Sequence, residues 1–206
     1  LFLNLTVIFY FLQLRSLAVT AELAIEDVTG CAQVDFADEY IGGLILSTPI
    51  DQVEEVRFMI CPEMIVSCLL FEKMGPLEAI HIVGAQRYSS YVGYRKRVIC
   101  DLIAIDALPY SDRTTQYKKE NIDRELNKAF AGFMSKSDDP RPIATGNWGC
   151  GVFNGDKELK SLIQLLAAAK AKRDVIYCTF YDKQFESSLI NQYELLICNK
   201  TTVGRY

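Results

Sequence analysis

The sequence is short of the residues that most metal and disulfide sites need. Its 206 residues include one histidine and seven cysteines. The cysteine count is odd and no two cysteines are spaced as CxxC, which argues against a disulfide framework and against a zinc site. Most cysteines lie in apolar runs, such as Ile176-Tyr177-Cys178. We therefore expect small buried thiols in a reducing compartment.

An excess of positive charge is also absent. The chain has 22 Lys and Arg against 26 Asp and Glu, a formal net charge of −4. A protein that holds nucleic acid through its phosphates normally has a basic excess or a basic stripe. Direct DNA binding is therefore not expected, and any polyanion must be held by local contacts.

No apolar run is long enough to span a membrane. Leu1 to Leu12 are apolar apart from Asn4 and Thr6, but a transmembrane helix needs about 20 such residues. A signal peptide would have basic residues before its apolar run, and the first basic residue here is Arg15. We expect a buried segment at this end, with a signal peptide as the alternative.

Short β-rich runs alternate with helix-like stretches. The apolar runs predict strands at residues 32–36, 77–83, 98–105 and 175–180. The apolar spacing predicts helices at residues 54–73, with an interruption at Pro62, and at residues 123–134 and 157–172. Residues 135–142 (SKSDDPRP) predict a surface loop. Strands separated by helices favour an α/β sheet with helices on both faces.

Two acidic clusters have residue types suited to a sugar substrate. In Asp35 to Gly43, carboxylates follow a predicted strand beside a Gly-Gly turn, where the backbone can approach a diphosphate closely. Glu54 and Glu55 begin a predicted helix, and acids in a first turn often only complement the helix dipole. Alternatively, one of them protonates the leaving oxygen of a glycosidic bond while the other fixes the sugar.

A third cluster is rich in glycine. Ala144 to Gly151 (ATGNWGCG) surrounds the only tryptophan and precedes Phe153 and a predicted helix. A glycine-rich loop before a helix N-terminus is suited to binding an anion. Such loops are common, so a generic turn is the other interpretation.

Taken together, these segments resemble the poly(ADP-ribose) glycohydrolase family over roughly nine-tenths of the chain. The family motifs match VDFAD at 34–38, GGL at 42–44, VEEVRF at 53–58, CPE at 61–63, QRYSSYVGY at 86–94, AIDAL at 104–108, RELNKA at 124–129 and ATGNWGCG at 144–151. The resemblance implies a macrodomain-like three-layer α/β/α fold with a mixed central sheet. It also implies one catalytic domain over residues 1–206, in which residues 1–16 are an apolar remnant of an accessory region.

The resemblance further implies hydrolysis of ribose–ribose bonds in poly(ADP-ribose) with release of ADP-ribose. Neither a metal nor another cofactor is expected. The implied partners are poly(ADP-ribose) and ADP-ribosylated proteins, with no membrane association. The chain is expected to be a monomer in the nucleus, the cytoplasm or both.

The family motifs also imply residue roles. Glu55 would be the general acid and then the base that activates water, while Glu54 and Asp35 would hold the neighbouring ribose. The diphosphate and the terminal ribose would lie between Tyr94 and Phe180, and the adenosine end would contact Glu26 and Asn147. The whole implied binding set comprises Glu26, Asp38, Gly42, Gly43, Tyr94, Asn147, Gly149, Gly151, Phe153 and Phe180.

The glycine loop departs from the family pattern. Leu44 stands in place of a third Gly, Asp38 in place of an Asn, and Val53 in place of a Gln. The segment leading to Glu54 is one residue longer and contains Pro49, which has no backbone donor. These departures favour an alternative, a non-catalytic ADP-ribose or poly(ADP-ribose) binding module with a degenerate catalytic loop. A third interpretation is a shortened chain that needs a partner to fold.

Overall fold

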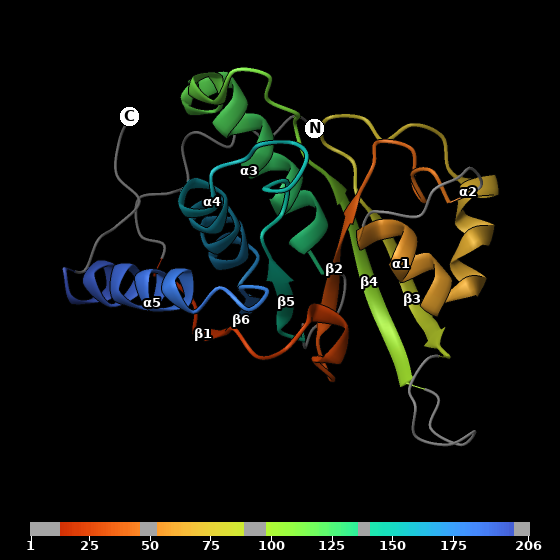
Figure 1. Cartoon of the computed structure of the whole chain (residues 1–206), viewed down its shortest axis with the longest axis horizontal. Helices are drawn as coiled ribbons and strands as arrows, with labels where there is room; N and C mark the ends of the chain where they lie inside the picture. Colours follow the sequence, from red (N-terminus) through yellow and green to blue (C-terminus); the bar gives the residue numbers. More distant parts are fainter. Residues whose placement is uncertain (1–12, 46–52, 89–97, 136–140, 200–206) are drawn as a thin grey trace.

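The computed structural model describes residues 13–45, 53–88, 98–135 and 141–199. A six-stranded sheet runs through them, with helices on both sides (Figure 1). Its strands are β1 Leu17–Thr20, β2 Ala32–Ala37, β3 Ile80–Arg87, β4 Val98–Asp106, β5 Ile143–Gly146 and β6 Val175–Cys178. The helices are α1 Val53–Ile60, α2 Ser67–Leu70, α3 Lys119–Phe133, α4 Lys157–Lys170 and α5 Lys183–Cys198. Three short 3-10 helices are η3 Ile25–Asp27, η4 Pro62–Val66 and η5 Arg113–Tyr117.

The sheet is mixed, as predicted. The strand order is β1-β6-β5-β2-β4-β3. Every pairing is parallel except that of β3 with β4, which is antiparallel. The carboxyl ends of the five parallel strands therefore meet at one edge of the sheet.

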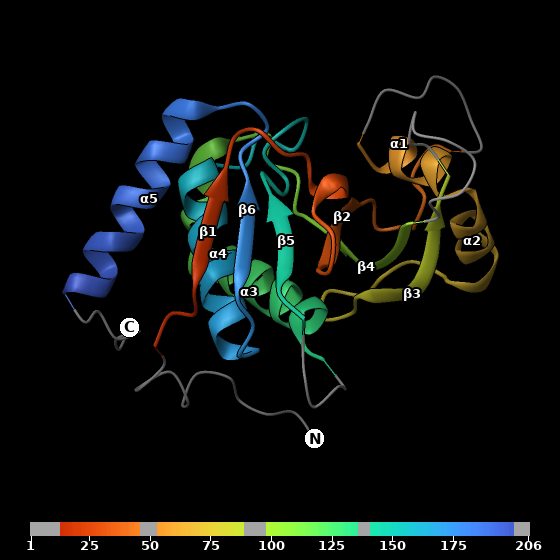
Figure 2. The same ribbon diagram turned by 90° about the horizontal axis from the view of Figure 1, so that it is seen from below.

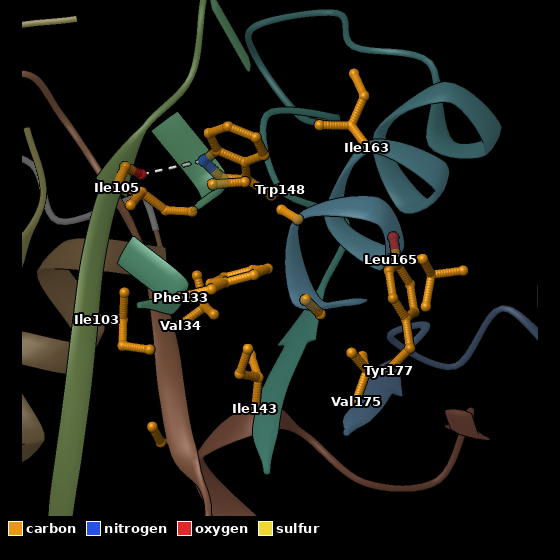
Figure 3. Packing of buried hydrophobic residues seen from close by; sticks show 14 of the residues in the cluster. Val34, Ile103, Ile105, Phe133, Ile143, Trp148, Ile163, Leu165, Val175 and Tyr177 are labelled. Carbon is orange, nitrogen blue, oxygen red and sulfur yellow. Dashed lines mark hydrogen bonds between the residues drawn. The ribbon is translucent and has the colours of Figure 1, made fainter. Parts of the chain in front are cut away.

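The larger core lies between the sheet and the helices α3, α4 and α5. Ile103 and Ile105 of β4 pack there with Phe133 of α3 and Leu165 of α4 (Figure 3). Trp148 is fully buried in the same cluster, and its indole N–H donates to the Ile105 carbonyl over 3.0 Å. A buried indole normally needs such a partner. This bond fixes the glycine-rich loop against the end of β4.

On the opposite face of the sheet, α1 packs at the end formed by β3 and β4. Leu102 and Ala104 alternate with the isoleucines of β4, so they point to this second face. Phe58 of α1 packs with them and is completely buried. Figure 2 shows α3 and α4 behind β1, β6 and β5, with α1 and α2 at the β3–β4 end. Helices thus lie on both faces, which confirms the three-layer prediction.

Aspartates begin α4 and α5, the helices that follow β5 and β6. The Asp156 side chain accepts the Leu159 N–H at the start of α4, and Asp182 accepts the Phe185 N–H at the start of α5, each over 2.9 Å. Such N-caps satisfy backbone donors that have no partner within the helix. None of the helices in the described residues is long and apolar enough to cross a lipid bilayer.

Several predicted boundaries were wrong. The strand predicted at 77–83 begins at Ile80, because Glu78 N–H donates to the Gly75 carbonyl over 3.1 Å and Leu77 falls in a turn. The helix predicted at 54–73 ends at Ile60 and continues as η4 and α2, so the interruption at Pro62 is confirmed. The predicted loop at 135–142 lies mostly outside the described residues.

Candidate active site

The loops that follow β2, β5 and β6 share one edge of the sheet. Ligands of open α/β sheets bind at the carboxyl edge of the strands. Asn147, after β5, joins two of these loops, because its Nδ2 donates to the carbonyl of Thr179, after β6, over 3.2 Å. This edge is the candidate active site.

Glu54 holds the loop that follows β2. Its two carboxylate oxygens accept the backbone N–H groups of Asp38, over 2.8 Å, and of Gly42, over 2.5 Å. Glu54 lies in the first turn of α1 and is 4% exposed. The two acidic clusters predicted from the sequence therefore meet. Glu54 already uses one hydrogen bond per oxygen to fix the loop.

Gly43 allows this loop to pass directly over both glutamates. Its φ is +50°, a conformation that favours glycine. A Cβ at this position would lie 2.8 Å from Glu55 Oε1 and 2.9 Å from Glu54 Oε2, closer than real Cβ atoms approach. Both the backbone conformation and the contact therefore require glycine at residue 43.

Glu55 has one engaged oxygen and one that has no partner. Its Oε1 accepts the Leu44 N–H over 3.0 Å. Its Oε2 is buried and has no hydrogen-bond partner among the described residues. A buried carboxyl oxygen without a partner is unfavourable for folding.

Asp35 is the third acid, and we call Asp35, Glu54 and Glu55 the carboxylate cluster. Asp35 lies in β2 and is 1% exposed, and within the described part of the chain neither of its oxygens has a hydrogen-bond partner. Burial raises the pKa of Asp35 to about 7, while the Arg57 guanidinium lowers it and the Glu55 carboxylate raises it further.

Glu54 holds its proton more tightly still. Burial and the Asp35 carboxylate raise the pKa of Glu54 to about 9, against the lowering effect of the Asp38 and Gly42 N–H groups. Buried acids that lie close together ionise less readily than exposed acids, because like charges repel and water is excluded. Asp35 and Glu54 are therefore weaker acids than ordinary carboxyl groups.

Arg57 is a residue whose role the sequence did not reveal. It is buried on α1, and its Nη1 donates to Gln33 Oε1 over 2.6 Å, while Nη2 lies 3.6 Å from Glu26 Oε2. Gln33 in turn donates to the Val28 carbonyl over 2.8 Å. Arg57 thus ties Glu26, a residue expected at the adenosine end, to the helix that begins with the two glutamates. The only sign of this role in the sequence is that Arg57 lies three residues after Glu54.

The glycine-rich loop after β5 offers backbone donors. Asn147 Oδ1 accepts the Tyr177 hydroxyl over 3.3 Å, so both ends of its amide are engaged. Gly149 has φ +71°, and a Cβ there would lie 2.6 Å from the Ala107 side chain. Among the described residues, the N–H groups of Gly149 and Gly151 have no protein acceptor. These two groups can therefore donate to a ligand.

The other predicted binding residues near this edge differ in their exposure and in their contacts. Phe180 is 71% exposed just after β6. Phe153 is half-buried and packs against the larger core. The Asp38 carboxylate accepts the Tyr40 N–H over 2.9 Å. Tyr94 and Pro49 lie outside the described residues, so their predicted placement is not addressed.

A cavity of about 360 Å³ lies next to this edge, between the first turns of α4 and α5. Asp156, Lys157 and Asp182 line it. Both aspartates cap helices, and Lys157 Nζ binds Asp182 over 2.7 Å. Lys157 and Asp182 are thus engaged with each other and Asp156 with the backbone, and the carboxylate cluster is not among the lining residues. Across the described ranges, no group of three His, Cys, Asp or Glu side chains is arranged to hold a metal ion.

Comparisons with known proteins point to one family. The family model described as "Poly (ADP-ribose) glycohydrolase (PARG), Macro domain fold" matches residues 10–101 and 95–187. "Poly(ADP-ribose) glycohydrolase 1" of Caenorhabditis elegans is 41% identical over 216 residues, which cover 89% of this chain and 27% of that protein. "Poly(ADP-ribose) glycohydrolase 2" of the same organism is 34% identical and aligns with 93% of this chain and 46% of its own length. The chain therefore spans between about a quarter and a half of these relatives.

A solved structure supports the same fold. A variant of the poly(ADP-ribose) glycohydrolase from Deinococcus radiodurans, in complex with ADP-ribose, superposes with a TM-score of 0.55 at 17% identity. The match covers 91% of this chain and 86% of that one. At this level of identity the similarity concerns the fold alone.

Proposed function

We propose that this chain, which belongs to the poly(ADP-ribose) glycohydrolase family, hydrolyses ribose–ribose bonds of poly(ADP-ribose) and releases ADP-ribose. One observation carries the proposal. Glu55 has a buried oxygen with no partner in the described residues, and it interacts with the buried Asp35. A fold has no structural need for such a cluster, whereas a glycosidic bond needs a buried acid beside a carboxylate.

Glu55 is assigned the proton transfers. Its Oε2 first gives a proton to the leaving ribose oxygen as the glycosidic bond breaks. The resulting carboxylate then takes a proton from the water that attacks the anomeric carbon, and Glu55 is restored. The water's hydroxyl group ends on the anomeric carbon and its proton is, in effect, delivered to the leaving oxygen.

Glu54 and Asp35 are assigned to the ribose next to the bond. Glu54 also holds the loop over the site through the Asp38 and Gly42 N–H groups. The positive charge of Arg57 favours the ionised form of Asp35, because its guanidinium lowers the pKa of that carboxyl. The diphosphate is assigned to the free N–H groups of Gly149 and Gly151. The adenosine end is assigned to Glu26 and Asn147.

The proposal includes partners and a compartment. Poly(ADP-ribose) and ADP-ribosylated proteins are the expected partners, and the chain is expected to act as a monomer. We propose the nucleus, the cytoplasm or both, because the seven cysteines are free thiols suited to a reducing compartment.

Release of ADP-ribose from poly(ADP-ribose) tests the assignment. Glu55→Gln keeps the shape and the acceptor for the Leu44 N–H but removes the exchangeable proton. We expect turnover to fall at least about 1,000-fold, within the range of general acid–base catalysis. Glu120→Gln makes the same change at an exposed position on α3 and should leave turnover intact. Equal turnover by the Glu55→Gln protein would reject Glu55 as the acid.

A non-catalytic binding module is the second candidate. The loop supports it, because the four N–H groups of Gly42 to Ile45 all donate within the protein, two of them to Glu54 and Glu55. A loop closed in this way has no donor left for a diphosphate. Calorimetry with ADP-ribose separates the two candidates. Binding without any release from poly(ADP-ribose) by the folded protein would favour the binding module.

A further inference from the structure

Two aromatic residues in succession have a backbone conformation that large side chains rarely adopt. Phe180 has φ +56° and Tyr181 has φ +63°. Positive φ is unfavourable for a bulky side chain because its Cβ approaches the backbone too closely. Glycine or asparagine would adopt this conformation readily. The segment therefore carries strain that a smaller residue would relieve.

Neighbouring elements hold the strained turn in place. The Thr179 N–H donates to the Thr20 carbonyl over 2.9 Å, and the Tyr181 N–H donates to the Ala21 carbonyl over 3.1 Å. The Thr179 hydroxyl donates to the Asp182 carbonyl over 3.0 Å. Strained backbones persist where their surroundings fix them, and they are concentrated at ligand sites. This turn meets that description.

Core packing does not account for the two rings. Phe180 is 71% exposed and Tyr181 is 70% exposed. The ring centroids lie 5.7 Å apart, and the ring planes are tilted by 59°. An exposed aromatic pair on a strained backbone is a stacking surface that the fold itself does not need. We call Phe180 and Tyr181 the aromatic pair.

The aromatic pair lies within reach of the carboxylate cluster. It follows β6, which is two strands from β2 in the sheet order. Adjacent strands are about 4.8 Å apart, so two spacings amount to about 10 Å. Asn147 lies on the intervening loop and donates to the Thr179 carbonyl, which fixes that loop to the turn that carries the aromatic pair. A ligand one nucleotide long spans such a distance.

We propose that Tyr181 stacks on a second adenine of poly(ADP-ribose), the base of the unit next to the one that occupies the carboxylate cluster. This inference rests on the proposed function, in which Phe180 serves the unit being released. Because the two rings are tilted by 59°, one flat base cannot stack on both. A polymer supplies a further base with every unit, and every base has a face that stacks on an aromatic ring.

Binding of polymer and of monomer in the Glu55→Gln protein tests the inference, since that protein does not consume the polymer. Tyr181→Asn removes the ring and fits the positive φ. We expect about tenfold weaker affinity for poly(ADP-ribose), in line with the loss of one stacked base. Affinity for ADP-ribose should stay within about twofold. Tm should rise by about 2–4 °C because strain is relieved, and Tyr181→Phe should restore polymer binding.

A matched control separates the ring from the strain. Lys172 also has a positive φ, +58°, and it precedes β6 at the opposite end of the strand from the aromatic pair. Lys172→Asn should raise Tm while the affinity for poly(ADP-ribose) stays within about twofold.

The contradicting outcomes differ in whether they overturn the inference alone or the proposed function as well. Unchanged polymer affinity in Tyr181→Asn would overturn the inference alone. An equal loss for ADP-ribose and for the polymer would place Tyr181 at the released unit and would overturn the second-adenine assignment. If the Glu55→Gln protein with Tyr181 intact bound no polymer, the proposed function would fail together with the inference.

Discussion

The protein buries two sets of charged side chains and pairs them in different ways. The carboxylate cluster has three acids, and the buried cation nearby, Arg57, donates to Gln33 and faces Glu26 instead. The second set, which we call the ion-pair network, alternates acids and bases across β4, α3 and α4. It consists of Asp106, Arg124, Glu125, Lys128 and Lys160.

Every member of the ion-pair network faces an opposite charge. Arg124 contacts Asp106 and also lies 2.9 Å from Glu125 Oε1. Lys128 Nζ lies 2.6 Å from Asp106 Oδ1, and Lys160 contacts Glu125. The Lys160 ammonium also lies 4.3 Å from the centre of the Trp148 ring. Each charge thus gains a partner that offsets its loss of water.

The difference in pairing between the two sets distinguishes a structural role from a chemical role. A buried charge that faces an opposite charge holds together the elements that carry the two groups. A buried acid without a partner destabilises the fold, yet it can exchange a proton with a substrate. We infer that the ion-pair network supports the fold and that the carboxylate cluster is maintained for catalysis.

Breaking the ion-pair network should produce the largest loss of stability. Glu125→Gln leaves the charge of Lys160 buried without its carboxylate and removes one of the two carboxylates that face Arg124. Removal of one partner from a buried pair lowers the free energy of unfolding by about 3–5 kcal/mol. Urea denaturation measures this loss of the free energy of unfolding. The control is Glu120→Gln, an exposed position on the same helix. A loss below about 1 kcal/mol would show that the network is not structural.

The carboxylate cluster should lower the free energy of unfolding as the pH rises. This is the opposite of the effect that most acids have in folded proteins. The pKa of Asp35 is raised from 3.8 to about 7 in the folded protein, so the folded state binds more protons than the unfolded state between these values. Its contribution to the free energy of unfolding is complete below about pH 4 and is lost as the pH rises through 7. The raised pKa of Glu54 extends the decline to about pH 9.

Urea denaturation from pH 5 to pH 8 measures this dependence. We expect the wild-type protein to lose about 2 kcal/mol more over this range than Asp35→Asn, which has no titrating group at residue 35. Taking the difference between the two proteins cancels the titration of groups that do not interact with Asp35. Parallel stability curves would contradict the raised pKa of Asp35.

Gly43→Ala should have the smallest effect on the free energy of unfolding. The new Cβ meets oxygens of Glu54 and Glu55, so the loop must shift, and we expect a loss of about 1–2 kcal/mol. Turnover should fall by about tenfold or more, because the same shift moves the carboxylates. Gly30→Ala is the matched control, with φ +76° and nothing within 4 Å of the new Cβ. If both variants lost turnover equally, contact with the glutamates would not matter.

The sequence predicted the parts of the fold whose local pattern is strong. The β4 strand and the α4 helix have long, regular apolar runs, and both were found close to the predicted bounds. The strands β1 (LAVT) and β5 (IATG) were missed because they contain few large apolar residues, whereas the equally short β6 (VIYC) was predicted. The α5 helix was also missed, since only two of its side chains, Phe185 and Leu189, are buried.

The site was predicted as a set of residues but not as an arrangement. The family motifs indicated Asp35, Glu54 and Glu55, which the structure brings together. The bonds from Glu54 to the Asp38 and Gly42 N–H groups join segments up to 16 residues apart, and no local pattern encodes them. Arg57 escaped prediction for the same reason, because its partners lie in β2 and η3.

The free energy of unfolding of Glu55→Gln at pH 7, in the sample used to score turnover, tests the central claim most directly. We expect a protein that has lost release of ADP-ribose but is as stable as the wild type or more so, because the amide takes one acid out of a crowded cluster and keeps the acceptor for the Leu44 N–H. A Glu55→Gln protein destabilised as strongly as Glu125→Gln would contradict the account, because Glu55 would then be a structural residue.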